Sequence, residues 1–110
     1  MPMNEIEELK SQFIKQLSPI RIYLFGSLAE GTYTENSDFD FYIVMDDKIT
    51  DLVGMTASAY KAIRSIKQRP VDIIVGTSSR FKERKDMMSV EKEVFEKGVL
   101  LYELGDDTVV

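Results

Sequence analysis

An apolar strand, a glycine–serine turn and a second strand that opens on two aspartates most constrain the fold of this chain. Gly26-Ser27 follows the apolar segment 20–25, and ten residues separate it from Asp38, with Asp40 two positions further on. Side chains two residues apart in a strand point to the same face, so we expect Asp38 and Asp40 to project together. Two carboxylates beside a turn that can hold phosphate indicate a divalent-metal site for phosphoryl or nucleotidyl chemistry.

The composition restricts what such a site can contain. The 110 residues include no cysteine and no histidine, which excludes disulfides, thiolate zinc sites and imidazole catalysis. A metal must therefore be held by oxygen ligands, which favours magnesium, manganese or calcium. The length and the 44% hydrophobic and 30% charged content predict one globular domain over 1–110, with mobile ends at 1–3 and 105–110.

The net charge is −5, with a pI near 4.7, and it argues against broad binding to nucleic acid or to an anionic membrane. A local basic cluster remains conceivable at Lys61, Arg64, Lys67 and Arg69. No apolar run is long enough for a membrane span and the N-terminus lacks a signal-peptide pattern, so we expect a cytoplasmic protein. The oligomeric state stays open.

Hydrophobic periodicity predicts helices over 4–17, 51–68 and 79–97, and strands over 20–25, 38–45, 71–75 and 99–102. One helical turn is expected after Ser27. Asn4 is the expected N-cap of the first helix, Gly76 the end of the third strand, and Gly98 a left-handed C-cap. This order predicts an α+β fold, a small mixed sheet covered by helices, with a parallel strand pair joined through the 51–68 helix.

The aspartates also have a plainer interpretation. Asp38 could simply end a turn, and Asp40 could face solvent. Aspartate is disfavoured in strands, however, and like charges on one face repel unless a cation intervenes. Asp72, in the apolar third strand, is either a polar residue at a strand start or a third ligand. A lone buried carboxylate is costly, so a neighbouring position would let it complete a metal trio or accept the proton of an attacking hydroxyl.

The glycine–serine turn has two compatible interpretations. Ser27 and Glu30 match the Ser-x-x-Glu capping box, which predicts a helix start. A helix N-terminus after a glycine also presents free N–H groups to phosphate, and the Ser27 hydroxyl can donate one further hydrogen bond. The Gly-Lys-Ser/Thr ending of a P-loop is absent.

Together, these residues resemble the minimal nucleotidyltransferase (MNT) family, within the superfamily that includes DNA polymerase β. The matching elements are Gly26-Ser27, Asp38 with Asp40, Asp72 within 71–75, and the ending 96–103. The resemblance implies a nucleotidyltransferase fold with two magnesium ions on the three aspartates. It further implies a nucleoside triphosphate as substrate, with ATP the expected one and its β- and γ-phosphates on Gly26 and Ser27. It also implies a small helical HEPN partner, the toxin of a toxin–antitoxin pair, as acceptor of AMP.

The family often has basic residues at two positions where this chain has Leu28 and Glu30. A glutamate near a triphosphate would repel it unless another contact holds it aside. Two alternatives therefore stand beside the enzyme: a catalytically weak or inactive binding module that neutralises or scaffolds a partner, and nucleotidyl transfer to a small molecule. Of the other features, the aromatic residues are expected in the core, Met87-Met88 on a partner surface, and the charges of 80–97 on a solvated helix face.

Overall fold

A computed structural model describes residues 2–34 and 36–105. Its elements are α1 (Met3–Leu17), β1 (Arg21–Phe25), α2 (Ser27–Glu30), β2 (Phe39–Met45), α3 (Leu52–Ile63), β3 (Val71–Thr77), α4 (Ser78–Arg84), α5 (Val90–Lys97) and β4 (Val99–Glu103). The four strands form one sheet in the order β3-β2-β1-β4. β1 is antiparallel to β2 and β4, whereas β2 is parallel to β3. The predicted mixed α+β sheet is confirmed, with α3 in the connection between the parallel strands.

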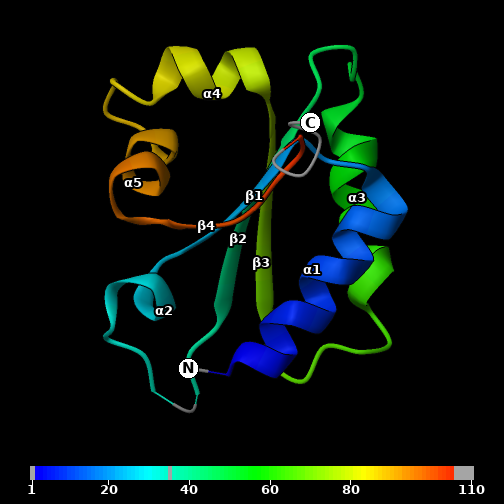
Figure 1. Ribbon diagram of the computed structural model, residues 1–110, viewed down its shortest axis with the longest axis vertical. Coiled ribbons are helices and arrows are strands. Elements are labelled where there is room, and N and C mark those ends of the chain that lie inside the picture. Colours follow the sequence, from blue (N-terminus) through cyan, green and yellow to red (C-terminus); the bar gives the residue numbers. More distant parts are fainter. Residues whose placement is uncertain (1, 35, 106–110) are drawn as a thin grey trace.

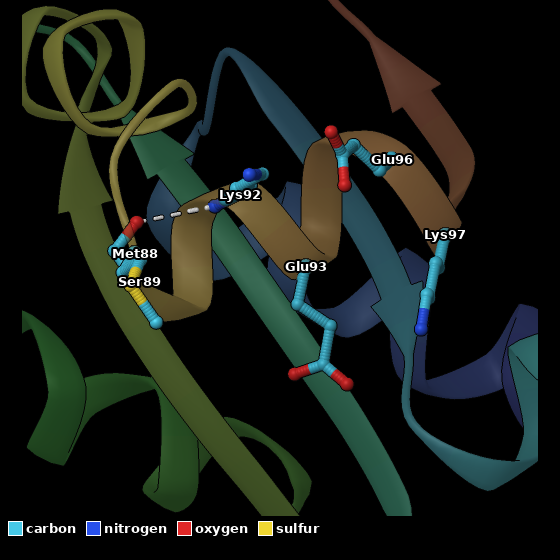
Figure 2. Close-up of a pocket in the computed structure, with 6 residues that line it drawn as sticks. All are labelled: Met88, Ser89, Lys92, Glu93, Glu96 and Lys97. Carbon is cyan, nitrogen blue, oxygen red and sulfur yellow. Dashed lines mark hydrogen bonds between the residues drawn. The ribbon is translucent and has the colours of Figure 1, made fainter.

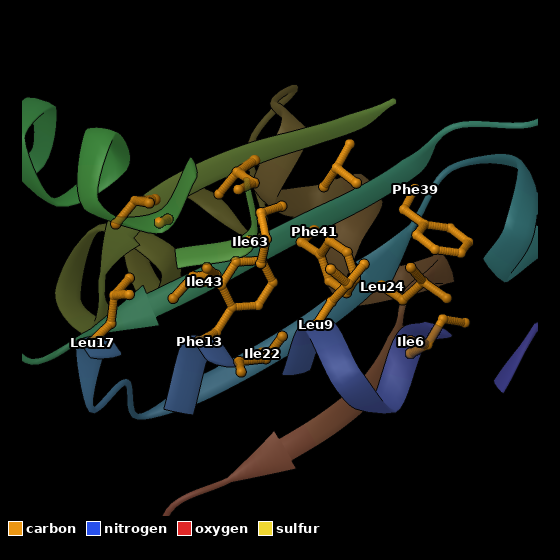
Figure 3. Close-up of a cluster of buried hydrophobic side chains, with 14 of the residues drawn as sticks. Ile6, Leu9, Phe13, Leu17, Ile22, Leu24, Phe39, Phe41, Ile43 and Ile63 are labelled. Carbon is orange, nitrogen blue, oxygen red and sulfur yellow. The ribbon is translucent and has the colours of Figure 1, made fainter. Parts of the chain in front are cut away.

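The sheet separates two helical layers (Figure 1). α1 and α3 cover one face, and α4 and α5 cover the other. The larger hydrophobic cluster lies under α1 and α3 (Figure 3). Alternate residues of β2 enter it, as the strand periodicity predicted, and so does the predicted apolar face of α1: Phe39, Phe41, Ile43 and Met45 from β2, and Ile6, Leu9, Phe13 and Leu17 from α1.

Two helix boundaries differ from the prediction, the start of α1 and the end of α3. α1 begins at Met3, and Pro2 rather than Asn4 occupies the cap position, without a side-chain cap. Ser18, at φ 54°, ends this helix in the left-handed conformation. α3 ends at Ile63, five residues before the predicted end at 68, although its start is as expected because the Asp51 side chain accepts a hydrogen bond from the Gly54 N–H at 2.9 Å.

The single helix predicted over 79–97 is wrong. The chain forms α4 and α5 with a break between them, and Ser89 is the cause. Its hydroxyl donates to the Arg84 carbonyl at 2.7 Å and accepts from the Lys92 N–H at 3.2 Å, so it starts a new helix. Met87, which we expected with Met88 on a partner surface, lies in the break and is 51% exposed, whereas Val94 of α5 is fully buried.

Two glycines act by their missing side chain. β3 runs past Gly76 to Thr77 because Gly76 pairs with Val44 in register. A Cβ on Gly76 would collide with the Tyr42 hydroxyl, so glycine lets this tyrosine cross the strand. Gly98 is not a left-handed cap, since its φ is −76°. A Cβ there would meet the Val94 carbonyl oxygen.

The expected mobile ends fall largely on residue 1 and residues 106–110, which lie outside the described residues. Within the described part, Met3 already belongs to α1. No helix among the described residues is long and apolar enough to cross a membrane.

Candidate active site

The parallel pairing of β2 and β3 brings two of the predicted carboxylates together. Asp40 and Asp72 are direct neighbours in register, and neighbours in register point to the same face of a sheet. Asp38 lies one residue before β2 and is exposed. β3 is an edge strand rather than the central strand we expected, and Asp72 is exposed. Asp72 is therefore not the buried carboxylate that we expected, but its expected position beside Asp40 is confirmed.

Asp40 is the electrostatic centre of this region. Burial is the first reason that its pKa rises from 3.8 to about 6. The negative charges of Asp72, Asp38 and Glu93 raise it further. A positive charge brought close to Asp40 would lower this pKa again. The three predicted aspartates are thus electrostatically coupled, with Asp40 in the middle.

Glu93 joins the group from a different element, and sequence reasoning missed it. It lies on α5 and points toward β2 (Figure 2). No local pattern marks this residue, because its position depends on how α5 packs across the sheet. The sequence alone shows Glu93 only as one of several charges on a helix.

Gly26 brings the turn into contact with the aspartates. β1 and β2 are antiparallel, with Phe25 opposite Asp40, so the turn that follows Phe25 lies beside this carboxylate. Gly26 has φ 78° and ψ −156°, a conformation that is essentially restricted to glycine. A Cβ on Gly26 would collide with the Asp40 carboxylate. Glycine is therefore required twice at this position, by the backbone and by the close approach of Asp40.

Ser27 is the first residue of α2, and Gly26 occupies the cap position. The predicted capping box is therefore wrong, since Ser27 would have to precede the helix to cap it. Within the described residues, the Ser27 hydroxyl has no hydrogen-bond partner, whereas its carbonyl accepts from the Thr32 N–H at 3.0 Å. Glu30, the departure from the MNT pattern, lies 4.0 Å from the Lys97 ammonium of α5. Its charge is thus partly balanced by a residue from across the turn.

An open pocket of about 460 Å³ borders this group on the α5 side (Figure 2). α5 and the residues before it supply its lining: Met88, Ser89, Lys92, Glu93, Glu96 and Lys97. One wall of the pocket thus contains both Glu93 and Lys97. Glu93 raises the pKa of Asp40, and Lys97 lies 4.0 Å from Glu30. The two lysines of this wall are matched by two glutamates, so the wall carries no net charge.

An ion pair supports the segment that leads into Asp38. The Arg69 guanidinium binds both carboxylate oxygens of Glu5, each at 3.0 Å, and donates to the Ser37 carbonyl at 3.3 Å. Its guanidinium carbon also lies 4.5 Å from the centre of the Phe39 ring. A bidentate, partly buried arginine is a rigid contact. Arg69 therefore anchors the backbone on either side of Asp38 and is not a free member of the expected basic cluster.

A buried polar network ties α5 to the strand of the aspartates. Glu91 is 1% exposed and accepts hydrogen bonds from the Tyr42 hydroxyl at 2.7 Å and from Arg84 at 3.0 Å. Arg80 lies 3.5 Å from the same carboxylate. Burial alone would raise the pKa of Glu91, but the hydrogen bonds from Tyr42 and Arg84 and the charge of Arg80 lower it overall. The region 80–97 is therefore not a uniformly solvated face.

The donor set suits a hard divalent cation, because every candidate ligand is a carboxylate oxygen. Among residues 2–34 and 36–105, however, no three acidic side chains converge tightly enough to form a ready-made metal site. What the structure provides is the coupled set Asp38, Asp40, Asp72 and Glu93, in which burial first, and then repulsion from the other three carboxylates, raises the pKa of Asp40. A bound cation would relieve that repulsion.

The fold is that of a nucleotidyltransferase. A crystal structure described as "a putative nucleotidyltransferase from Sulfolobus solfataricus" matches with a TM-score of 0.62 at 20% identity, over 94% of this chain and 81% of the other. A structure described as "the toxin-antitoxin with AMP-PNP" matches with a TM-score of 0.58 at 22% identity, over 97% of this chain and 77% of the other. A structure of a variant of the toxin–antitoxin MntA–HpeT matches with a TM-score of 0.59 at 22% identity, over 97% and 76%.

The chain belongs to the nucleotidyltransferase domain family, whose sequence profile matches residues 6–101. A Methanocaldococcus jannaschii protein named "putative protein adenylyltransferase" is 33% identical over 100 residues, which span 88% of this chain and 90% of that protein. The predicted family is confirmed, and the chain is a nucleotidyltransferase.

Proposed function

We propose that this nucleotidyltransferase moves AMP from ATP onto a hydroxyl group of a partner protein, with magnesium held by Asp38, Asp40 and Asp72. The observation that carries the proposal is the coupling of these carboxylates around Asp40, directly beside the Gly26 turn. Carboxylates that repel one another across neighbouring strands cost stability unless they bind a cation. Divalent ions in such sites stabilise the charge that develops on phosphate oxygens.

The residues of the chain have separate roles in this proposal. Gly26 leaves room for a phosphate to approach the backbone, and the Ser27 hydroxyl, unpartnered within the described residues, is free to donate to a phosphate oxygen. The first N–H groups of α2 lack acceptors within their own helix. Asp72, exposed on the edge strand β3, would accept the proton of an attacking hydroxyl. Transfer forms a bond from the acceptor oxygen to the α-phosphorus and releases pyrophosphate.

The proposed acceptor follows from the relatives. The Methanocaldococcus relative carries the name of a protein adenylyltransferase, and the fold neighbours include toxin–antitoxin structures, one of them with AMP-PNP. A toxin is the proposed partner on this ground, and the resemblance to the MNT family makes a small helical HEPN protein the proposed toxin. Glu30 does not weigh heavily against nucleotide binding, because Lys97 lies 4.0 Å from it.

The test combines the chain, ATP, magnesium and the purified product of the neighbouring gene. Intact-protein mass spectrometry should show that product gaining whole AMP units, and Asp40→Asn should prevent the gain. An unchanged mass with folded proteins would contradict transfer to this partner. Calorimetry with ATP and magnesium then separates an enzyme from a non-catalytic binding module, since only a nucleotide site needs to release or absorb heat.

A further inference from the structure

A second pocket, of about 230 Å³, lies between α4, α5 and β1. Its α5 residue is Phe95, which is two positions from Glu93 and therefore points to a different side of the helix. The pocket in Figure 2 shares no lining residue with it. The residues that line this second pocket are Arg21, Tyr23, Ser78, Phe81, Lys82, Lys85 and Phe95. The proposed transfer chemistry uses none of them.

This lining carries three cations and no carboxylate, in a chain whose net charge is −5. Arg21 has donors to spare, since its Nε is buried and finds no hydrogen-bond partner among the described residues. Its Nη1 lies 4.0 Å from Glu103, at the limit of an ion pair. A buried, unpaired N–H is costly and calls for an acceptor. Positive charge is therefore concentrated here without a matching acid in the lining.

Aromatic and apolar groups accompany these cations. The Tyr23 and Phe81 rings stack with their centres 5.2 Å apart. Phe95 is 50% exposed, with the Lys85 ammonium 4.5 Å from the centre of its ring. Leu100 pairs with Tyr23 across β1 and β4 and is 45% exposed. The apolar surface thus continues from the pocket to β4, which is the outer strand of the sheet.

We propose that this basic-aromatic surface, made by Arg21, Tyr23, Lys82, Lys85, Phe95 and Leu100, docks a segment of a partner protein in which carboxylates flank an aromatic or leucine side chain. Opposite charges would orient the segment, and the apolar side chain would fill the pocket as its anchor. The exposed Phe95 and Leu100 favour a protein over a nucleic acid. In the described part of the chain β4 pairs only with β1, and its outer edge extends the surface beyond what a small anion covers.

The experiment selects binding peptides from a random library displayed on phage, with the full chain as bait. Selected peptides are then synthesised with a fluorescent label, and their affinities are measured by anisotropy. The test variant carries Lys82→Glu and Lys85→Glu. The charge-matched control carries Lys61→Glu and Lys67→Glu, two exposed lysines outside this surface. Calorimetry with ATP and magnesium runs in parallel on all three proteins.

Selected sequences should share acidic residues beside an aromatic or leucine residue. The test variant should bind them about tenfold or more weakly, the control within about twofold, and added salt should weaken binding to the unaltered chain. ATP binding should be the same in all three proteins, so a chain that fails to bind ATP would contradict the proposed function and not this surface. Selection without acidic residues, equal binding by the test variant, or competition by polyuridine would overturn the proposal.

Discussion

The two faces of the sheet differ in the polarity of their buried side chains, and β2 contributes residues to both faces. Its odd-numbered residues, from Phe39 to Met45, pack under α1 and α3 in a cluster of hydrophobic side chains. Its even-numbered residues Asp40 and Tyr42 face α4 and α5, where a half-buried carboxylate and a buried hydrogen-bonded network lie. The α1 and α3 face therefore holds the larger hydrophobic cluster, whereas the α4 and α5 face combines a smaller hydrophobic cluster with polar groups.

Phe41→Ala should have the largest effect on stability. Phe41 is fully buried, with its ring centre 5.2 Å from that of Phe13 and 6.1 Å from that of Phe39. Its truncation leaves a cavity and should cost about 3–5 kcal/mol in the free energy of unfolding. Urea denaturation followed by circular dichroism measures this loss. Phe95→Ala, at a half-exposed position, is the matched control and should cost well under half as much.

Tyr42→Phe tests the opposite face without changing its shape. The variant removes the hydroxyl that donates to Glu91 and leaves a buried carboxylate with fewer donors. We expect a loss of about 1–3 kcal/mol, together with faster hydrogen exchange at the amides of α5. Tyr23→Phe is the control, because the Tyr23 hydroxyl has no hydrogen-bond partner among the described residues and its removal should change neither quantity. An unaltered exchange rate in Tyr42→Phe would mean that the network does not hold α5.

Asp40→Asn should stabilise the fold while abolishing nucleotidyl transfer. The folded chain holds the Asp40 proton up to about pH 6, whereas the unfolded chain releases it near 3.8. Between pH 3.8 and about pH 6 the folded chain therefore binds this proton more strongly than the unfolded chain does. The stability that Asp40 contributes falls as the pH rises through this range. The variant should be about 1 kcal/mol more stable at pH 7, a value reduced for solvent screening.

Urea denaturation at pH 4 and pH 7 measures this effect, and the difference between Asp40→Asn and the unaltered chain should shrink at pH 4. At limiting magnesium, transfer by the unaltered chain should also decline below about pH 6, because protonation of Asp40 competes with binding of the metal. A destabilised Asp40→Asn would show that the carboxylate has a structural role instead.

Periodicity was sufficient for the α1 and α3 face, because hydrophobic burial repeats along the chain and leaves its period in the sequence. The apolar residues of α1 and the alternation in β2 lie where they were predicted. The α4 and α5 face could be predicted only in part. Glu91 accepts a hydrogen bond from Tyr42 and Glu93 acts electrostatically on Asp40, each from about fifty positions away, and no short-range pattern encodes such interactions. The break between α4 and α5 was not predicted, because it depends on two hydrogen bonds of the Ser89 hydroxyl. In the sequence, Ser89 looks like any exposed serine of a helix.

The spacing of the motifs predicted which residues lie close together in the candidate site, but not how exposed each of them is. Gly26 and Asp40 meet because an antiparallel pair returns the chain to the turn, and Asp72 lies beside Asp40 because β3 is parallel to β2. The exposure of Asp72 could not be inferred, since an apolar strand at the edge of a sheet has the same composition as a central one. The metal and phosphate roles of these residues remain predictions.

The smallest expected effect concerns Glu30, which faces Lys97 beside the turn. Their charged groups lie 4.0 Å apart and both side chains are substantially exposed, so Glu30→Gln should change the free energy of unfolding by less than about 0.5 kcal/mol. If Lys97 balances the charge of Glu30, this variant should change ATP affinity little. Lys97→Gln should weaken it about two- to threefold, and the double variant should restore most of the loss. Calorimetry with ATP and magnesium on all four proteins closes the cycle. A large gain in affinity from Glu30→Gln alone would mean that Glu30 repels the nucleotide despite Lys97, and that this nucleotidyltransferase keeps a repulsive charge inside its phosphate-binding turn.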